Sequence, residues 1–319
     1  MVPPFRRRPP LCANRGPART GCGARSPRPV PPPRLPRRSP GTAAMNRFPA
    51  LLRTTLAALW IGAAAALPAH AQFSCPQPEV LRFEVQRTID RSETGFTQGL
   101  EVHGGQLLEG TGSVGGSSVI NTIDPATGAV RRMADLGTSV FGEGLTVLDN
   151  RMYQLTWMDR KVFVRDLSGR LIREMRNERE GWGLTNNGTD LIFSDGSGSL
   201  FVADPQTFAV RRTIPVRSSL GVPIQGINEL EHVRGEVYAN LFGDWAIVRI
   251  SLASGCVTGI SDLGSLRQLM SREEQARLAA DSNHVLNGIA YDAEKGVFYV
   301  TGKRWRTIFA GRFDRVQAR

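Results

Sequence analysis

Cysteine and histidine are scarce in this chain, with four of each among 319 residues. The cysteines are Cys12, Cys22, Cys75 and Cys256, so the chain has no Cys-x-x-Cys pair and no cluster of cysteine with histidine. Structural zinc sites in proteins are built from such clusters. The sequence therefore gives no indication of a fold held together by zinc.

Acidic residues are absent from residues 1–71, which contain twelve arginines. The whole chain carries a formal charge of +11, but the part from Gln72 onward has 28 basic and 29 acidic residues, a net charge of −1. Attraction to nucleic acid or to an anionic membrane surface needs an excess of positive charge. The folded part of the chain is therefore not expected to bind either of them.

Residues 1–44 consist mostly of Arg, Pro, Gly, Ala and Ser without apolar periodicity. Such a segment cannot bury enough apolar surface to offset the entropy of ordering, so we expect it to be disordered. It is either a functional basic tail or a stretch upstream of a true translation start at Met45. The second interpretation is favoured, because an intact export signal follows Met45.

Residues 45–71 have the features of a signal peptide. A positive start at Arg47 precedes an apolar stretch over residues 56–67, and Ala69-His70-Ala71 places small residues at the −3 and −1 positions of a cleavage site. The apolar stretch is shorter than a transmembrane helix and is followed at once by Pro68. The sequence predicts an exported protein, either periplasmic or secreted, with no membrane contact after cleavage.

Export also changes the interpretation of the cysteines. After cleavage before Gln72, only Cys75 and Cys256 remain. In an oxidising compartment we expect these two to form one disulfide. The mature chain, residues 72–319, is long enough for one substantial core, and we expect a monomer.

The mature chain contains five similar segments. Each opens with a short motif in which, in four of the five, a polar or aromatic residue precedes glycine and an aliphatic residue. The openings are Thr97–Leu100, Gly142–Leu145, Gly181–Leu184, Ile227–Leu230 and Leu286–Ile289. Further predicted strands follow each opening, and repeats of about 40–50 residues with four strands are typical of propeller blades. The sequence predicts an all-β fold, a five-bladed β-propeller over residues 72–319.

Two segments fall outside the five repeats. Residues 79–89 alternate apolar and polar before the first repeat, and the last repeat ends after its third strand. We predict that this N-terminal strand completes the fifth blade, so that no sheet edge stays exposed. Residues 263–280 have apolar residues near helical spacing with charges between them, which predicts one surface helix inserted between blades four and five.

One position in the opening motif differs between the repeats. The residues there are Gln98, Glu143, Trp182, Asn228 and Asn287. The innermost strands of a propeller run along a central channel, so equivalent positions should converge at one mouth. A purely structural role would favour the same residue in every repeat, and the differences therefore favour a specialised site. The alternative is that these side chains only bond to neighbouring strands or to channel water.

Glu143 is the only acid among these five residues. It is flanked by glycines and lies near Trp157 and Trp182, so we expect partial desolvation to raise its pKa toward the range useful for proton transfer. The two tryptophans either line a pocket or belong to the core. Lys303, at the end of a predicted strand, either holds a substrate carbonyl group or extends into solvent.

Six motifs, in order between about Val85 and Phe313, resemble the signature of the plant and bacterial glutaminyl cyclases, also called glutamine cyclotransferases. These motifs are Phe96–Leu100, Phe141–Leu145, Gly181–Leu184, Asn228–Glu231, Leu286–Ala290 and Thr301–Lys303. The family is a five-bladed propeller, unrelated in fold to the zinc-dependent animal enzymes. The resemblance implies cyclisation of an N-terminal glutamine, by attack of its α-amine on its own side-chain amide, to 5-oxoproline and ammonia. It implies no required cofactor and no catalytic metal, and a structural calcium ion in the channel is left open.

The resemblance also implies roles for single residues. Glu143 would be the catalytic acid and base. The substrate-binding residues would be Phe96, Gln98, Trp157, Trp182, Asn228, Phe242 and Lys303. The polar ones would bind the substrate's amide and backbone groups and stabilise charge on the carbonyl oxygen, and the aromatic ones would wall the pocket. Phe242 stands where the plant enzymes have a tryptophan, so an aromatic wall remains while an indole N–H donor is lost.

Two other functions remain open from the residues alone. A metal-dependent, lactonase-like propeller hydrolase would use glutamate and asparagine oxygens as calcium ligands, and Glu143, Asn228 and Asn287 could supply part of such a set. A propeller that only binds a partner is the other. The cyclase hypothesis implies peptides or proteins with an N-terminal glutamine as partners.

Overall fold

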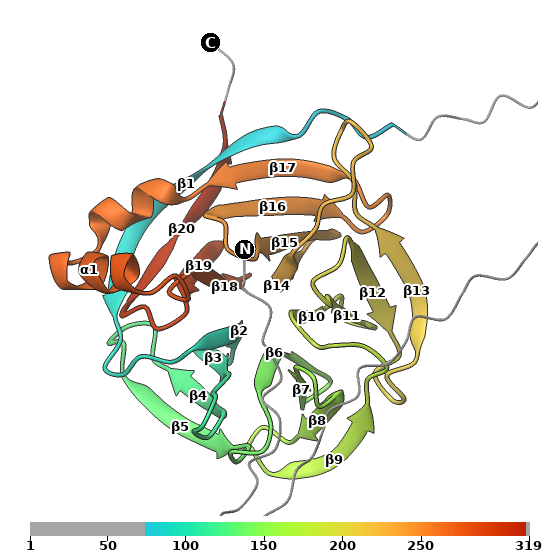
Figure 1. Ribbon diagram of the computed structural model, residues 1–319, viewed down its shortest axis with the longest axis vertical. Coiled ribbons are helices and arrows are strands. Elements are labelled where there is room, and N and C mark those ends of the chain that lie inside the picture. The colour runs from blue at the N-terminus through green and yellow to red at the C-terminus, as the bar shows by residue number, and fades with distance from the viewer. Residues whose placement is uncertain (1–73, 317–319) are drawn as a thin grey trace, which may run out of the picture. The chain divides into compact units, whose positions relative to one another are not determined.

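The computed structural model describes residues 74–316 (Figure 1). The predicted disordered leader, residues 1–44, and the predicted signal peptide, residues 45–71, lie outside these residues. Nearly all regular structure described is β-strand, which confirms the all-β prediction. The helices in this part of the chain are a 3-10 helix, η1 (Gly264–Leu269), and an α-helix, α1 (Arg272–Ala280), and neither is long and apolar enough to cross a membrane.

Three antiparallel sheets of four strands follow one another along the chain, each with its strands in chain order. The first contains β2 (Thr97–His103), β3 (Gln106–Thr111), β4 (Val119–Ile123) and β5 (Val130–Asp135). The second contains β6 (Gly142–Leu148), β7 (Arg151–Thr156), β8 (Lys161–Arg165) and β9 (Leu171–Arg176). The third contains β10 (Leu184–Asn186), β11 (Leu191–Phe193), β12 (Ser199–Ala203) and β13 (Val210–Pro215).

The remaining strands form one sheet of eight, which consists of two antiparallel halves. One half contains β14 (Ile227–Val233), β15 (Glu236–Leu241), β16 (Ala246–Ser251) and β17 (Val257–Asp262). The other contains β18 (Leu286–Asp292), β19 (Val297–Gly302), β20 (Thr307–Arg315) and β1 (Glu79–Asp90). The halves are joined only where Glu79 and Val80 of β1 pair in parallel with β17.

The N-terminal strand pairs with the last strand of the chain, as predicted. β1 runs antiparallel to β20, with its partners extending from Leu81 opposite Arg315 to Asp90 opposite Thr307. Figure 1 shows β1 passing along the outside of both β17 and β20. Both ends of the described chain are therefore held in one sheet, and the first strand has a neighbour on each side.

The predicted disulfide is confirmed, because Cys75 and Cys256 are bonded to each other. It links the residues just before β1 to the turn just before β17. The same two elements pair where Glu79 and Val80, the first residues of β1, lie opposite Gly259 and Ile260 of β17. The covalent bond and the strand pairing thus attach the N-terminal segment at one place.

The innermost strands lie close together because the motif glycines have no side chain. A Cβ atom at Gly99, Gly144 or Gly183 would lie 2.5, 2.4 or 2.0 Å from a backbone atom of the next inner strand. Each of β2, β6, β10, β14 and β18 contacts the next, and β18 contacts β2 again. The glycines in the repeated motif therefore allow the inner strands to form a closed ring, which Figure 1 shows around the centre of the molecule.

The fourth repeat has Glu229 where the other repeats have glycine. Its side chain is fully buried, and its two carboxylate oxygens accept hydrogen bonds from the backbone N–H groups of Leu100, at 3.1 Å, and Ile289, at 2.7 Å. These donors belong to β2 and β18. One carboxylate thus connects three inner strands and satisfies two buried backbone donors.

The apolar core lies between neighbouring sheets in several clusters. One cluster, for example, joins Leu155 and Val162 of the second sheet to Leu191 and Phe193 of the third. Another joins the third sheet to the half that begins with β14. Packing between flat faces of this kind holds the sheets in a fixed order while their inner strands face a common interior.

The segment predicted as one helix, residues 263–280, forms two helices instead. Met270 has an extended backbone between them, and the hydroxyl of Ser271 accepts the N–H of Glu274 at 3.1 Å as the N-cap of α1. Glu274 is buried and accepts a hydrogen bond from Thr307 Oγ1 at 2.7 Å. Capping ends the first helix and starts the second, and α1 is attached to β20 by a buried polar contact.

Candidate active site

Three of the five variable motif residues form one hydrogen-bonded chain. Asn287 Nδ2 donates to Gln98 Oε1 at 3.3 Å, and Gln98 Nε2 donates to Glu143 Oε1 at 3.0 Å. Asn287 Nδ2 also donates to the carbonyl of Thr97 at 2.9 Å, which fixes its amide. All three side chains are 5 % exposed or less. Strands β18, β2 and β6 thus bring these residues together and direct a hydrogen-bond donor at Glu143.

Glu143 lies in an environment that favours its protonated form. Burial raises the pKa of Glu143 well above the ordinary value, the charge of Lys303 partly lowers it again, and the carboxylate of Glu180 raises it further. Burial lowers the pKa of Lys303, and Glu143 opposes that change. The pKa values of the carboxyl group and of the amine are thus both shifted in the direction that favours proton exchange.

Five aromatic rings and two charged side chains, both of which act electrostatically on Glu143, are linked in a closed ring of contacts that we call the cage. In order, its members are Phe96, Phe141, Trp157, Glu180, Trp182, Phe242 and Lys303. Ring centroids are 6.1 Å apart for Phe96 and Phe141, 5.8 Å for Phe141 and Trp157, and 5.5 Å for Trp182 and Phe242. All three pairs meet edge to face, the arrangement that aromatic rings prefer.

The two charged side chains close the cage on different sides. Glu180 Oε2 accepts hydrogen bonds from Trp157 Nε1 at 3.0 Å and from Trp182 Nε1 at 3.3 Å. Lys303 Nζ lies 5.0 Å from the ring centroid of Phe96 and 5.2 Å from that of Phe242. Glu180 thus joins the two indoles, and Lys303 joins the two phenyl rings by cation–π contacts.

The topology explains why these residues meet. Phe96, Phe141 and Trp182 come just before the inner strands β2, β6 and β10, whereas Trp157 and Lys303 come just after the second strands β7 and β19. In an antiparallel pair, the start of one strand lies beside the end of its neighbour. All of these positions are therefore at the same end of the ring of inner strands.

The structure brings together most of the residues singled out in the sequence. The cage contains Phe96, Trp157, Trp182, Phe242 and Lys303, and the hydrogen-bonded chain contains Gln98 and Glu143. Asn228 is 2 % exposed, and its carbonyl accepts a hydrogen bond from Ser194 Oγ at 2.7 Å. Within residues 74–316, no hydrogen bond connects the side-chain amide of Asn228 to the other predicted residues.

Two cage residues were missed by the sequence analysis. Phe141 precedes Glu143 by two positions, just as Phe96 precedes Gln98, so an alignment of the repeats contained the signal for it. Glu180 lies in the loop between β9 and β10, one residue before the motif that contains Trp182. A loop has no periodicity from which the direction of a side chain can be predicted.

A cavity of about 390 Å³ adjoins the cage. It is lined in part by Phe96 and Phe141, and by Arg132 and Arg304 with several serine and threonine residues. The guanidinium of Arg304 lies 5.4 Å from the ring centroid of Phe96. The cavity therefore begins at the cage wall and continues between polar side chains.

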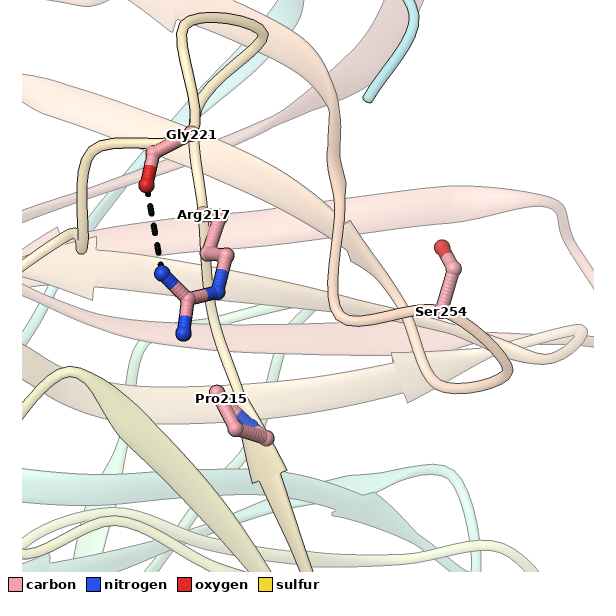
Figure 2. Close-up of a pocket in the computed structure, with 4 residues that line it drawn as sticks. All are labelled: Pro215, Arg217, Gly221 and Ser254. Atoms are coloured by element: carbon pink, nitrogen blue, oxygen red, sulfur yellow. Dashed lines mark hydrogen bonds between the residues drawn. The ribbon is translucent and has the colours of Figure 1, made fainter. Parts of the chain in front are cut away.

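A separate cavity of about 440 Å³ lies at the turn after β13 (Figure 2). Its lining residues are Pro215, Arg217, Gly221 and Ser254, and Arg217 Nη1 donates to the carbonyl of Gly221 at 3.2 Å. None of the predicted site residues lines it.

The positions of the side chains that could bind a metal ion were compared among the described residues. Between residues 74 and 316, no group of three or more His, Cys, Asp or Glu side chains is placed to hold a metal ion. Of the oxygen ligands considered for a lactonase-like site, Glu143 and Asn287 are joined through Gln98 by hydrogen bonds instead.

Known proteins resemble the whole of this fold and site region. The family model described as glutamine cyclotransferase matches residues 55–313. A curated Arabidopsis thaliana protein named glutaminyl-peptide cyclotransferase is 34% identical over 239 residues, which cover 74% of this chain and 72% of that protein. The crystal structure of Myxococcus xanthus glutaminyl cyclase matches with a TM-score of 0.67 and 31% identity, covering 76% of this chain and 100% of the other. The chain belongs to the glutamine cyclotransferase family.

Proposed function

We propose that this protein is a glutaminyl-peptide cyclotransferase that converts an N-terminal glutamine of peptides or proteins to pyroglutamate and releases ammonia. Family membership supports the activity. The observation that carries the assignment of the site is the buried Glu143, which lies beside Gln98 and acts electrostatically on Lys303 within the cage.

In the proposed reaction, Glu143 acts as both base and acid. The neutral α-amine donates its lone pair to the side-chain amide carbon, a C–N bond forms, and the C=O π electrons move to oxygen. Glu143 takes a proton from the attacking nitrogen and gives one to the amide nitrogen. The carbonyl then re-forms, the bond to the amide nitrogen breaks, and ammonia leaves.

The other site residues support this step by binding and orientation. Lys303 and the amide of Asn228 would stabilise negative charge on the reacting oxygen. Gln98, held by Asn287, would keep the Glu143 carboxyl group in place. The aromatic walls would hold the glutamine side chain bent toward its own amine, and this proximity is the main contribution to an intramolecular ring closure.

The architecture that we propose is a five-bladed β-propeller. Three sheets of four strands are separate, and the sheet of eight divides into two further groups of four at the short parallel contact between β1 and β17. The closed ring of five inner strands supports one blade for each of them. On this assignment, η1 and α1 lie between blades four and five.

We also propose that the protein acts outside the cytoplasm, in the periplasm or after secretion, as a monomer without a required cofactor. The disulfide between Cys75 and Cys256 supports export, because disulfides persist in oxidising compartments. The cavity next to the cage would receive the residues that follow the N-terminal glutamine, since it begins at Phe96 and Phe141.

The test is an assay of purified protein with a glutamine-initiated peptide. We expect release of one ammonia per peptide, with excess EDTA making no difference. The N-acetylated form of the same peptide should not react, because its nitrogen is no longer a nucleophile. Ammonia release that EDTA abolishes, or the absence of any release, would contradict the proposal, and lactone hydrolysis lost to EDTA would favour the lactonase-like alternative.

A further inference from the structure

Glu180 has a free hydrogen-bond acceptor in the wall of the cage. Both indole N–H groups, of Trp157 and Trp182, donate to the same oxygen, Oε2. Within residues 74–316, no hydrogen bond involves the other oxygen, Oε1, and no lysine, arginine or histidine forms an ion pair with Glu180. The side chain is half-buried. A carboxylate that is fixed in position but has no cationic partner is prepared to bind a cation.

The position of Glu180 relative to the other charges indicates which cation that is. Glu180 and Lys303 are the two charged members of the cage, and aromatic rings separate them on both sides, two on one side and three on the other. Both charges act on Glu143, since Lys303 lowers the pKa of Glu143 and Glu180 raises it. The cage is thus negative on the tryptophan side and positive on the phenylalanine side, with the proposed base acted on by both charges.

An N-terminal glutamine has the matching polarity. Its α-amine is a cation over much of the physiological pH range, and its side-chain carbonyl becomes negative during the reaction. We propose that Glu180 is the binding site for the α-ammonium group of the substrate, with Trp157 and Trp182 providing the aromatic faces beside it. This inference rests on the proposed function. It orients the substrate with its amine toward Glu180 and its amide oxygen toward Lys303.

Such a site explains a requirement of the reaction. The bound ammonium group must lose a proton to Glu143 before the neutral amine attacks, so Glu143 must be within its reach. The proton transfer between the two nitrogens then follows as proposed, and the extra proton leaves Glu143 with the departing ammonia, as ammonium. A carboxylate that holds the ammonium near Glu143 supplies that arrangement without itself taking the proton. Glu180 is then a binding residue, and Glu143 remains the base.

A purely structural role, in which Glu180 only ties the two indoles, makes a different prediction. The variant Glu180→Gln keeps an oxygen that can accept both indole N–H groups and removes the charge. The variant Glu180→Ala removes both. Glu178→Gln is the matched control. Glu178 precedes Glu180 by two residues, but it is exposed, forms an ion pair with Arg176 and does not belong to the cage.

Kinetics with a glutamine-initiated peptide separate the two roles. For Glu180→Gln we expect KM to rise about 10- to 100-fold, the range for loss of one charge-assisted hydrogen bond, with a smaller change in kcat. The acid limb of the kcat profile should move to lower pH. The charged groups acting on Glu143 are Lys303, after β19, and Glu180, before β10, and the variant removes the one that raises its pKa. Wild-type KM in Glu180→Gln, with loss only in Glu180→Ala, would overturn the proposal.

A binding measurement separates this inference from the proposed function. Calorimetry on Glu143→Gln would compare a glutamine-initiated peptide with its N-acetylated form, and then repeat the comparison on Glu143→Gln/Glu180→Gln. We expect the free amine to bind at least 10-fold more tightly than the acetylated peptide, and this preference to disappear in the double variant. If the Glu143→Gln variant, which retains Glu180, bound the two peptides with equal affinity, the inference would be overturned. If binding selects the free amine and depends on Glu180, but the wild-type protein releases no ammonia, only the proposed function would be contradicted.

Discussion

At the scale of single residues, the proposed site contains one buried carboxyl group, Glu143, whose pKa is shifted by its burial and by its neighbours. Gln98 donates a hydrogen bond to it, Lys303 favours its charged form, and burial and Glu180 oppose that form. Removing any of these neighbours should therefore change the pH dependence of activity in a direction that the sign of the interaction predicts.

The most direct prediction is the loss of turnover in Glu143→Gln. An amide of the same shape cannot exchange the proton, and general acid–base catalysis contributes about 10²- to 10⁴-fold. We expect the rate of ammonia release to fall by about 10²-fold or more. The thermal unfolding midpoint should stay at or above that of the wild type, because a buried ionisable group has been removed. Turnover close to wild type would contradict the role of Glu143.

The second prediction concerns Lys303→Met. Lys303 lowers the pKa of Glu143, so its removal should raise that pKa further. A base with a higher pKa becomes ionised at higher pH, and the acid limb of the kcat profile should therefore move upward, opposite to the shift expected for Glu180→Gln. Measuring kcat from pH 5 to 9 for both variants checks the two signs against each other, and a shift in the same direction for both would contradict this electrostatic description.

The sequence indicated which residues at repeated positions lie together in the structure. Gln98 and Glu143 could be aligned because the glycine after each of them is required for strand contact. The sequence could not predict Glu180, because its position depends on how a loop places two tryptophans from different strands. Asn228 was predicted in the same way as Gln98, but its side chain has no hydrogen bond to the chain of Asn287, Gln98 and Glu143.

At the scale of elements, two features hold the inner strands together: glycines that allow close approach of the backbones, and one long side chain, Glu229. Glycines let β2, β6, β10 and β14 approach, and Glu229 then reaches from β14 to β2 and β18. The repeat pattern predicted the strands, since each repeat meets the same packing problem. It could not predict the function of Glu229, because that residue breaks the pattern.

We predict that Glu229→Ala destabilises the protein strongly. Two buried N–H groups, of Leu100 and Ile289, would lose their acceptor, at about 1–3 kcal/mol each. The free energy of unfolding in urea should therefore fall by about 2–6 kcal/mol. Glu294→Ala is the control, because Glu294 is exposed, and its effect should stay within about 0.5 kcal/mol. A similarly small effect of Glu229→Ala would show that β14 does not depend on this contact.

The division of the segment 263–280 into two helices illustrates a second limit. Apolar spacing indicated helical structure correctly, and Ser271 followed three residues later by Glu274 was a capping signal within it. The prediction of one helix rested on the apolar periodicity of the whole segment and did not use this local capping signal. Caps compete with helix continuation because they satisfy the same backbone donors.

At the scale of the whole molecule, we expect stability to depend on pH through three carboxyl groups that are buried or half-buried. Burial raises the pKa of Glu101 from 4.5 to about 7, and raises the pKa values of Glu229 and Glu231 well above the ordinary value. The folded protein then holds protons that the unfolded chain has already released. The free energy of unfolding should therefore decrease as pH rises from 4.5 toward 7.

This fourth prediction is checked by urea unfolding at several pH values. Glu101→Gln cannot lose a proton, so the decrease between pH 4.5 and 7 should be smaller in this variant than in the wild type. The exposed Glu294→Gln should leave it unchanged. An increase in wild-type stability over this interval would contradict the raised pKa values.

The fifth prediction concerns the disulfide, which closes a loop of 181 residues in sequence separation. Cross-linking such a long loop restricts the unfolded chain, and removal of a native disulfide typically costs about 2–5 kcal/mol. The variant Cys75→Ser/Cys256→Ser should show that decrease in the free energy of unfolding, with ammonia release per folded molecule unchanged because the cage is elsewhere. Wild-type stability in the variant would contradict this.

The pairing of β1 with β20 has a consequence for biosynthesis. β1 leaves the ribosome well before β20, the antiparallel partner with which it forms a sheet. The nascent polypeptide therefore cannot complete the pairing of β1 until residues near 315 have emerged from the exit tunnel.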